Sequence, residues 1–259
     1  MSHPSIGLIG GGRAARILLG GWQCAGVELP QAVVCETDDA TFAALVAAAP
    51  EMAVVRGDAG QAAQQAVVVL AVHPPQVAEA AGSIAGQLDA EAIVVSLAPK
   101  VTLAKLQDLL GGFNRVARVI PNAPSLIRRG FNPVAWGDAL DDDDRQTIRA
   151  LLRPLGELPE VAEETLEAYA ILTAMGPTYF WPQWLELAAL AQEFGLPEDD
   201  AWHALRAMTI GAVEMLTSSR LSAEQVVDLI PVKPLADFEG EFRGAYRSRL
   251  PALFDKIHP

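Results

Sequence analysis

Cysteine, aromatic residues and positive charge are all scarce in this sequence. Its 259 residues include two cysteines, Cys24 and Cys35, too few for a disulfide framework or a cysteine-based zinc site. Only 6% of the residues are aromatic, and 19 lysines and arginines face 32 acidic residues, which gives a net charge of −13. This charge argues against nucleic acid and anionic membranes as partners. An anionic ligand would therefore depend on backbone N–H groups and a few basic side chains.

Long apolar runs are also missing. The longest uncharged stretch, Ala168–Leu185, falls slightly short of the roughly 20 residues that a membrane span needs, and Gly176, Pro177 and Pro182 interrupt it. No secretory signal is evident, because glycines interrupt the first apolar run. We therefore expect a soluble, cytoplasmic protein in which this stretch forms a pair of buried helices.

The sequence does contain an alternation of short apolar runs and helical segments over its first three-fifths. Continuous apolar runs such as Ala66–Val72 are typical of parallel strands buried on both faces. This alternation predicts a doubly wound parallel sheet. The expected strands are Ile6–Ile9, Ala32–Cys35, Met52–Val55, Ala66–Val72, Ala92–Leu97, Val116–Ile120 and Pro133–Trp136, and the expected helices between them are Thr41–Ala49, Gln76–Gln87 and Leu103–Leu110.

The pattern changes near Pro159. From Ala162 onward it is almost wholly helical, so we place a domain boundary at Leu158–Val161. The sequence therefore predicts an α/β domain over residues 1–158 and an all-α domain over residues 159–259. The expected helices of the second domain are Glu164–Ala174, Thr178–Phe194, Glu198–Ser218, Ala223–Leu229 and Phe238–Ile257.

Four consecutive acids, Asp141–Asp144, precede a helix expected over Thr147–Leu155. Acids in this position cap a helix and complement its dipole. Metal ligation would need converging ligands from elsewhere in the sequence, and none is apparent. We therefore predict a helix cap here and no metal site.

A glycine-rich turn follows the first expected strand and is the most informative motif. Gly10, Gly12 and Ala15 fit the pattern G-x-G-x-x-G/A, in which the second glycine lets the backbone approach a pyrophosphate. The N–H groups of the following helix N-terminus then face the anion. The other residues of this segment are Gly11, Arg13 and Ala14. The motif predicts a dinucleotide site, and a turn with a purely structural role is the alternative.

Glu36 ends the second expected strand, where the motif expects an acid that binds the ribose hydroxyls. Glu36, Asp38 and Asp39 would repel a 2′-phosphate, and no lysine or arginine lies between Glu36 and Pro50. Arg13 lies beside the phosphate site and would favour a 2′-phosphate from the other side. We expect NAD(P)H as the cofactor, with NADH favoured. In the alternative interpretation, the acids only solvate a turn and cap the next helix.

Five sequence blocks, in order along the chain, carry a family resemblance: Ile6–Arg16, Leu70–Gln76, Val95–Leu103, Arg118–Leu126 and Ala174–Tyr179. With these blocks the chain resembles pyrroline-5-carboxylate reductases over nearly its whole length. The resemblance implies a Rossmann domain followed by a helical dimerisation domain. It implies a homodimer or larger homo-oligomer, with each active site between one chain's cofactor domain and its partner's helices. The implied reaction, that of proline biosynthesis, transfers hydride from a reduced nicotinamide to the carbon of a cyclic imine acid.

The resemblance also implies roles for single residues. Gly10–Ala15 would hold the pyrophosphate, and Val72, His73 and Pro74 would line the adenosine side. The family usually has lysine where His73 stands, and the loss of that cation again favours NADH. Ala98 and the turn that contains Asn122 would border the nicotinamide. The Asn122 amide would meet the carboxamide or the substrate, or would serve only as a turn side chain.

The sequence departs from the family where the substrate is held. The family has a Ser-Pro-Gly-Gly-Thr-Thr stretch, whereas residues 228–235 contain neither glycine nor threonine. Lys233, set between two prolines, either binds the substrate carboxylate, protonates the imine nitrogen or is a solvated loop lysine. Thr178 and Tyr179 are the other candidate proton donors. An imine acid other than pyrroline-5-carboxylate is therefore a candidate substrate.

Two other functions are alternatives. The missing substrate loop is compatible with a dinucleotide-binding sensor or scaffold that lacks catalysis. A β-hydroxyacid dehydrogenase shares the architecture, but that class has a catalytic lysine on a helix of the second domain, and no lysine lies between Lys105 and Lys233. Oxidation of NADH with cyclic imines would separate a reductase from a sensor.

Overall fold

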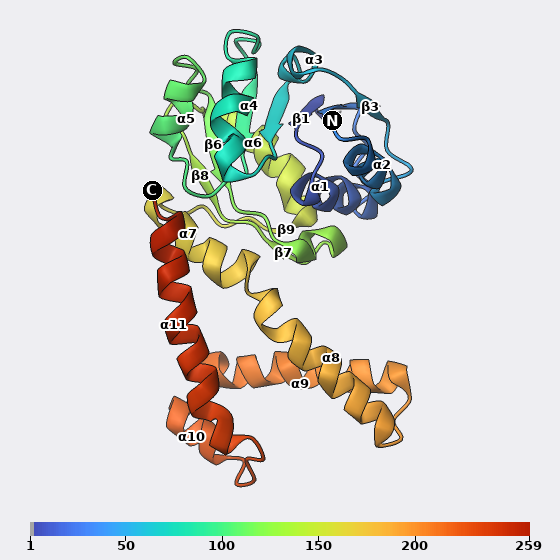
Figure 1. The fold of residues 1–259 in the computed structure, drawn as a ribbon, viewed down its shortest axis with the longest axis vertical. Helices are drawn as coiled ribbons and strands as arrows, with labels where there is room; N and C mark the ends of the chain where they lie inside the picture. Colours follow the sequence, from blue (N-terminus) through green and yellow to red (C-terminus); the bar gives the residue numbers. More distant parts are fainter. Residues whose placement is uncertain (1–2) are drawn as a thin grey trace. The chain divides into compact units, whose positions relative to one another are not determined.

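The structure is a computed structural model that describes residues 3–259, which form two compact units. The first unit contains the chain up to Met175 together with Leu253–Pro259, and the second contains Gly176–Ala252 (Figure 1). These units are defined by packing. The expected boundary between a cofactor domain and a helical domain at Leu158–Val161 stays a prediction.

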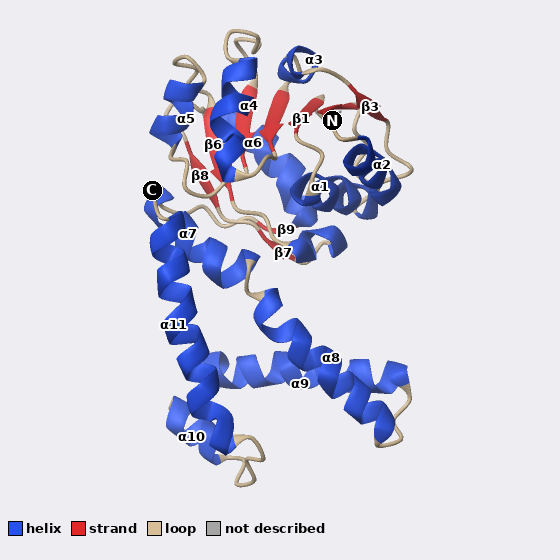
Figure 2. Ribbon diagram, in the orientation of Figure 1, coloured by secondary structure: helices blue, strands red, loops and turns tan. Residues whose placement is uncertain are grey.

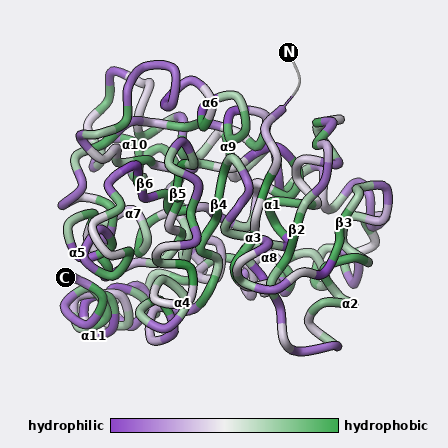
Figure 3. The backbone as a smooth tube through the Cα atoms, turned by 90° about the horizontal axis from the view of Figure 1, so that it is seen from above, coloured by the Kyte–Doolittle hydropathy of each residue, from purple (hydrophilic) through white to green (hydrophobic). Residues whose placement is uncertain are grey.

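A seven-stranded sheet forms the centre of the first unit, as far as the described residues show. Its strand order is β3-β2-β1-β4-β5-β6-β8, with every pair parallel except β6 and β8. The strands are β1 (Ile6–Ile9), β2 (Ala32–Cys35), β3 (Val54–Arg56), β4 (Val67–Leu70), β5 (Ile93–Ser96), β6 (Val116–Val119) and β8 (Val134–Trp136). This confirms the predicted doubly wound, mainly parallel sheet. Strands such as β4 are continuously apolar because both of their faces are buried (Figure 3).

Helices cover both faces of the sheet (Figure 2). One face packs against α1 (Arg13–Cys24), α2 (Asp39–Ala48) and α6 (Asp142–Leu152). The other packs against α3 (Ala59–Ala63), α4 (Val77–Ile84) and α5 (Leu103–Leu109). Trp22 of α1 is 1% exposed, and its indole Nε1 donates to the carbonyl oxygen of Leu151 in α6 at 2.7 Å.

The acidic run before α6 is a helix cap, as predicted, although the helix starts earlier than expected. Asp141 is the N-cap: its carboxylate accepts from the Asp144 N–H, and the Asp144 carboxylate accepts from the Asp141 N–H. Because the acids themselves can enter a helix whose first turn they stabilise, α6 begins at Asp142 and not at Thr147.

Several short elements were not predicted from the sequence. They are α3 and a two-stranded sheet of β7 (Gly130–Phe131) and β9 (Gly156–Glu157). Two single-turn segments, η3 (Arg153–Leu155) and η4 (Glu163–Thr165), coincide with parts of predicted helices. Three others were not predicted, namely η1 (Pro74–Gln76), η2 (Ala123–Ile127) and η6 (Ala236–Phe238). All of these are too short to carry a recognisable hydrophobic period.

The chain then leaves the sheet through η4, α7 (Leu166–Tyr169) and the π-helical segment η5 (Ala170–Ala174). Leu166 and Ala170 are buried against Ile120 and Ala135 of the sheet region, and Ile257 packs against the same cluster. The expected helix Glu164–Ala174 is therefore present, but it consists of consecutive 3-10, α-helical and π-helical segments.

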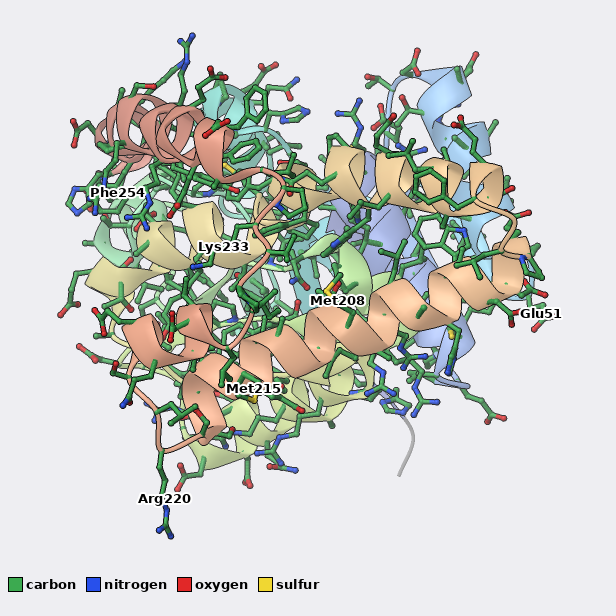
Figure 4. All side chains as sticks on the ribbon, turned by 90° about the horizontal axis from the view of Figure 1, so that it is seen from below. Glu51, Met208, Met215, Arg220, Lys233 and Phe254 are labelled. Carbon is green, nitrogen blue, oxygen red and sulfur yellow. The ribbon has the colours of Figure 1, made fainter. Side chains whose placement is uncertain are left out.

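The second unit is helical. It contains α8 (Pro177–Glu193), α9 (Glu198–Ser218), α10 (Ala223–Asp228) and all but the last residues of α11 (Glu239–Ile257). The rings of Tyr179 and Tyr246 meet edge to face at 5.9 Å, which ties the start of α8 to α11. Many apolar side chains of this unit are exposed, including Met208 and Met215 of α9 (Figure 4). The predicted C-terminal helical region is confirmed. Within residues 3–259, no helix combines the length and apolar character needed to cross a membrane.

Candidate functional site

A cleft of about 620 Å³ lies at the carboxyl ends of β1, β2, β4 and β5. The chain leaves β1 toward β2 on one side, and β4 pairs with β1 on the other, so the cleft is at the topological switch point of the sheet. Ligands of open α/β sheets bind at this place. Of the predicted cofactor residues, the following line the cleft: Gly10, Gly12, Arg13, Ala14, Glu36, Val72, His73, Pro74 and Ala98.

Two glycines of the turn lack a side chain in different surroundings, one closely packed and one open. Gly10 has φ +99°, and a Cβ there would lie 2.9 Å from both the Ala71 carbonyl oxygen and Val72 Cγ1. Gly12 is the N-cap of α1 and no side chain caps this helix end. A Cβ at Gly12 would meet no atom within 4 Å, so it would project into open space at the cleft. The start of α1 therefore borders open space in the cleft, and the first N–H groups of a helix have no partner within the helix.

The remaining turn residues, Gly11 and Ala15, support the site from outside the cleft lining. Ala15 is fully buried in the core, where its small side chain lets α1 approach the sheet. The Gly11 N–H donates to Glu36 Oε2 at 2.9 Å. The glycine turn and the end of β2 are therefore joined by a direct hydrogen bond.

Both carboxylate oxygens of Glu36 accept hydrogen bonds from backbone N–H groups. Oε2 accepts from Gly11, and Oε1 accepts from the Asp38 N–H at 2.9 Å. The neighbouring thiol of Cys35 also lines the cleft, and its pKa is raised by burial and further by the charges of Glu36 and Asp58. The β2 end of the cleft is therefore acidic, as the sequence predicts.

Arg56, at the end of β3, lies beside this acidic end and was missed in the sequence analysis. Its guanidinium donates to the carbonyl oxygens of Glu36 and Thr37 and to the Asp39 carboxylate. Arg56 lies 20 residues after Glu36, beyond the segment up to Pro50 that contains no lysine or arginine. The parallel pairing of β2 with β3, which brings residue 56 next to Val34, could have pointed to this arginine.

The opposite side of the cleft is bordered by Leu97, Ala98 and Pro99, which follow β5. Just beyond them, Lys100 adopts φ +74° and its N–H donates to Glu167 Oε1 at 2.9 Å. The Leu103 N–H donates to Glu163 Oε1 at 2.6 Å. Two carboxylates from η4 and α7 thus fix the backbone of the loop that carries Ala98.

Both carboxylates are paired with one buried arginine. Arg118 of β6 is 0% exposed and meets Glu163 at 2.9 Å and Glu167 at 2.5 Å. Within the described residues, the buried Arg118 Nε and Glu167 Oε2 have no hydrogen-bond partner. Sequence reasoning did not find this cluster.

Asn122 does not line the cleft. Its Nδ2 donates to the Thr173 carbonyl oxygen at 3.2 Å, and its Oδ1 accepts from the Phe131 N–H at 3.0 Å. The side chain is 8% exposed and joins η5 to β7. This environment corresponds to the structural alternative considered for Asn122.

The other candidate catalytic residues belong to the second unit. Thr178 and Tyr179 lie in the first turn of α8, where burial, with a smaller contribution from Tyr246, raises the pKa of Tyr179. Lys233 is exposed on the loop between α10 and α11 (Figure 4). In the part of the chain that is described, no group of three His, Cys, Asp or Glu side chains could hold a metal ion.

Comparison with known proteins adds family information. Residues 5–100 match the family described as "NADP oxidoreductase coenzyme F420-dependent". The chain is 28% identical to pyrroline-5-carboxylate reductase of Pseudomonas aeruginosa over 227 residues, which cover 87% of this chain and 83% of that protein. It is 31% identical to the reductase of Corynebacterium melassecola over 163 residues, covering 61% of this chain and 60% of that protein.

The fold is shared with a solved reductase structure. The Plasmodium falciparum pyrroline carboxylate reductase, solved with NADP bound, has a TM-score of 0.80 over 100% of this chain and 98% of that one, at 19% identity. The chain is thus similar to pyrroline-5-carboxylate reductases in sequence and in fold, and its residues 5–100 are similar to a family of NADP oxidoreductases.

Proposed function

We propose that this protein is a member of the pyrroline-5-carboxylate reductase family that reduces the C=N bond of a cyclic imine acid with NAD(P)H. The observation that carries this proposal is the cleft at the sheet's switch point, where Gly12 leaves open space before the start of α1, which no side chain caps. Residues 1–158 would form the Rossmann domain, and residues 159–259 the dimerisation and substrate domain.

The chain's own residues would bind and orient the cofactor. The N–H groups that follow Gly12, together with Arg13 and Ala14, would hold the pyrophosphate, because the start of a helix carries a partial positive charge. Val72, His73 and Pro74 would contact the adenosine side, and Ala98 would border the nicotinamide. The bound cofactor would supply the hydride for the imine carbon.

We further propose that NADH is preferred over NADPH. The Glu36 carboxylate, fixed by two backbone N–H groups, would accept from the ribose hydroxyls and would repel a 2′-phosphate. Dissociation constants of both cofactors test this. Tighter binding of NADPH would contradict it, and replacing Glu36 with alanine is expected to narrow the difference.

The substrate would be an imine acid, and its carboxylate would need a positive partner because residues 228–235 contain no glycine. Lys233 is our candidate for this partner or for the donor to the imine nitrogen, with Thr178 and Tyr179 as the other donors. Asn122 would act by fixing the loop around it. Such a donor adds roughly 10²–10⁴-fold to a rate, and positioning supplies much of the rest.

The experiment is NADH oxidation followed at 340 nm with a panel of five- and six-membered cyclic imine acids. Turnover with at least one of them is expected, and the Gly12→Val variant serves as a control that keeps the fold and loses the cofactor. Tight NADH binding with no turnover on any imine would favour the sensor alternative, which the altered loop at residues 228–235 suggests.

A further inference from the structure

Arg56 interacts with two carbonyl groups of the loop between β2 and α2 and with the carboxylate of Asp39, the first residue of α2. Its Nε donates to the Glu36 carbonyl oxygen at 2.7 Å, and its Nη2 donates to the Thr37 carbonyl oxygen at 2.8 Å. Its Nη1 pairs with Asp39 Oδ1 at 2.5 Å. The guanidinium also lies over the Phe42 ring, 5.2 Å from its centroid. The two backbone contacts hold the side chain in place, and Asp39 neutralises its charge.

This arginine lies beside the acidic end of the cleft. Glu36 and Thr37, whose carbonyl groups it binds, both line the cleft. An acid at the end of β2 is where the ribose 2′-oxygen binds in this fold class, and a nearby arginine is the usual partner of a 2′-phosphate. The side chains of Arg56 and Asp39 are 37% and 92% exposed, so a ligand can reach the pair.

We propose that the ion pair between Asp39 and Arg56 determines cofactor selectivity. The Asp39 carboxylate pairs with the Arg56 guanidinium, which would otherwise bind a 2′-phosphate. This inference rests on the proposed dinucleotide function and assigns the choice between the two dinucleotides to a specific residue. Asp39 acts through Arg56 and is therefore a positioning residue, whereas Glu36 meets the ribose directly.

The chemistry of the pair explains the effect. A 2′-phosphate would have to displace the Asp39 carboxylate from Nη1 while lying close to Glu36 and Asp38. Replacing Asp39 with asparagine keeps the side-chain size and removes the competing charge. The contacts of Arg56 to the two carbonyl oxygens persist, so the guanidinium stays beside the cleft with its charge available.

The test measures binding by titration calorimetry for four ligands: NADH, NADPH, 5′-AMP and adenosine 2′,5′-bisphosphate. Four proteins are compared, namely the parent, Asp39→Asn, Arg56→Met and the double variant. Asp39→Asn is expected to tighten NADPH and the bisphosphate at least about threefold, the scale of an exposed charge pair, and to leave NADH and 5′-AMP within about twofold. In the Arg56→Met background, Asp39→Asn should not tighten the binding of NADPH or of the bisphosphate.

Asp138→Asn is the matched control, because Asp138 is exposed after β8 at the opposite edge of the sheet. It should change none of the four affinities. A gain that persists in the double variant would mean that Asp39 acts by plain repulsion, and would overturn the proposal, as would unchanged NADPH binding in Asp39→Asn. If the parent binds none of the four ligands, the proposed dinucleotide function itself is wrong, and the inference about Asp39 is wrong as well.

Discussion

At the residue scale, Gly7, Gly10 and Gly12 lie close together in the sequence but lack a side chain for different reasons. A Cβ at Gly7 would lie 1.9 Å from the Ala62 carbonyl oxygen, so β1 can contact α3 only through glycine. Gly10 needs its positive φ, which other residues rarely adopt. Gly12 has neither restriction, since open space faces it. Because Gly12 also lines the cleft, its open surroundings support the proposed pyrophosphate site.

The first prediction separates fold from function at Gly12. The Gly12→Val variant should stay folded and lower the thermal midpoint by no more than about 4 °C, because a Cβ at this position meets no protein atom within 4 Å and only the N-cap preference for glycine is lost. It should weaken NADH binding by more than about tenfold, because the valine fills the space before α1. Differential scanning fluorimetry and calorimetry measure the two effects. Gly82→Ala, in α4 with open space around it, is the control that should leave binding unchanged; unchanged binding in Gly12→Val would contradict the phosphate site.

The second prediction concerns how the alkylation rate of the Cys35 thiol depends on pH. Burial, with Glu36 and Asp58, raises the pKa of this thiol, so less thiolate is present at a given pH than in an ordinary cysteine. Alkylation by iodoacetamide should therefore be slow at pH 7, increase as the pH rises past the ordinary thiol range, and slow down when NADH fills the cleft. Mass spectrometry of modified peptides gives the rates. Exposed Cys24 is the internal control, and equal NADH protection of both cysteines would show that the effect is not local.

The third prediction concerns Lys233. The Lys233→Met variant should raise the KM or lower the kcat for any active imine acid by about tenfold or more, since a hydrogen bond to a charged group is worth about 1.5–3 kcal/mol. NADH affinity should stay within about twofold. Lys105→Met, at an exposed position on α5, is the matched charge control. Steady-state kinetics identical to those of the parent would make Lys233 a solvated loop residue.

At the element scale, one buried arginine connects three parts of the first unit. Arg118 of β6 pairs with Glu163 in η4 and Glu167 in α7, and the same two carboxylates accept from the backbone of the loop after β5. The loop that borders the cleft at Ala98 is therefore fixed by the segment that leads toward the second unit.

The fourth prediction follows from this burial. Glu167→Gln leaves the Arg118 charge with less compensation where water cannot reach it, and should lower the free energy of unfolding by about 3 kcal/mol. Urea denaturation measures the loss. Glu239→Gln breaks the exposed pair with Arg243 and should cost less than about 1 kcal/mol. Equal losses in the two variants would show that the Arg118 cluster is not a buried charge pair.

The accuracy of the sequence predictions also depends on the element. The strand ends were predicted to within about two residues because the apolar runs are continuous and bounded by glycine, proline or acids. The position of Glu36 and the capping role of Asp141 follow from local chemistry. The Arg118 cluster joins residues 45 and 49 positions apart, and Arg56 reaches back 17 to 20 positions. Neither has a local pattern, so only the folded sheet reveals them.

At the scale of the whole molecule, the second unit exposes more apolar surface than a monomer in water is expected to show. Leu185, Val213 and Leu216 are 61%, 58% and 57% exposed, on α8 and α9. Large apolar patches of this kind mark interfaces. The resemblance to a family with a helical dimerisation domain supports the same interpretation.

The fifth prediction is therefore that the protein is at least a dimer at micromolar concentration. Light scattering should give a mass of twice the 27.5 kDa chain or a higher multiple. A Val213→Asp variant should have a larger dissociation constant for the oligomer than the parent, because a charge in an apolar interface is costly. Glu214→Asp, at the adjacent and exposed position, is the control. A parent that remains monomeric would refute the association.

The packing of residues 253–259 with the first unit has a consequence for how the protein is made. Ile257 joins the cluster of Ile120, Ala135, Leu166 and Ala170, although the helices of the second unit separate it from them along the chain. On the ribosome, β1 gains its second neighbour only when β4 has been synthesised, and the cluster stays open until the segment after Ala252 has emerged. The first unit, whose synthesis starts before that of the second, is thus completed only after it, which leaves this apolar cluster without Ile257 while residues 171–252 are synthesised.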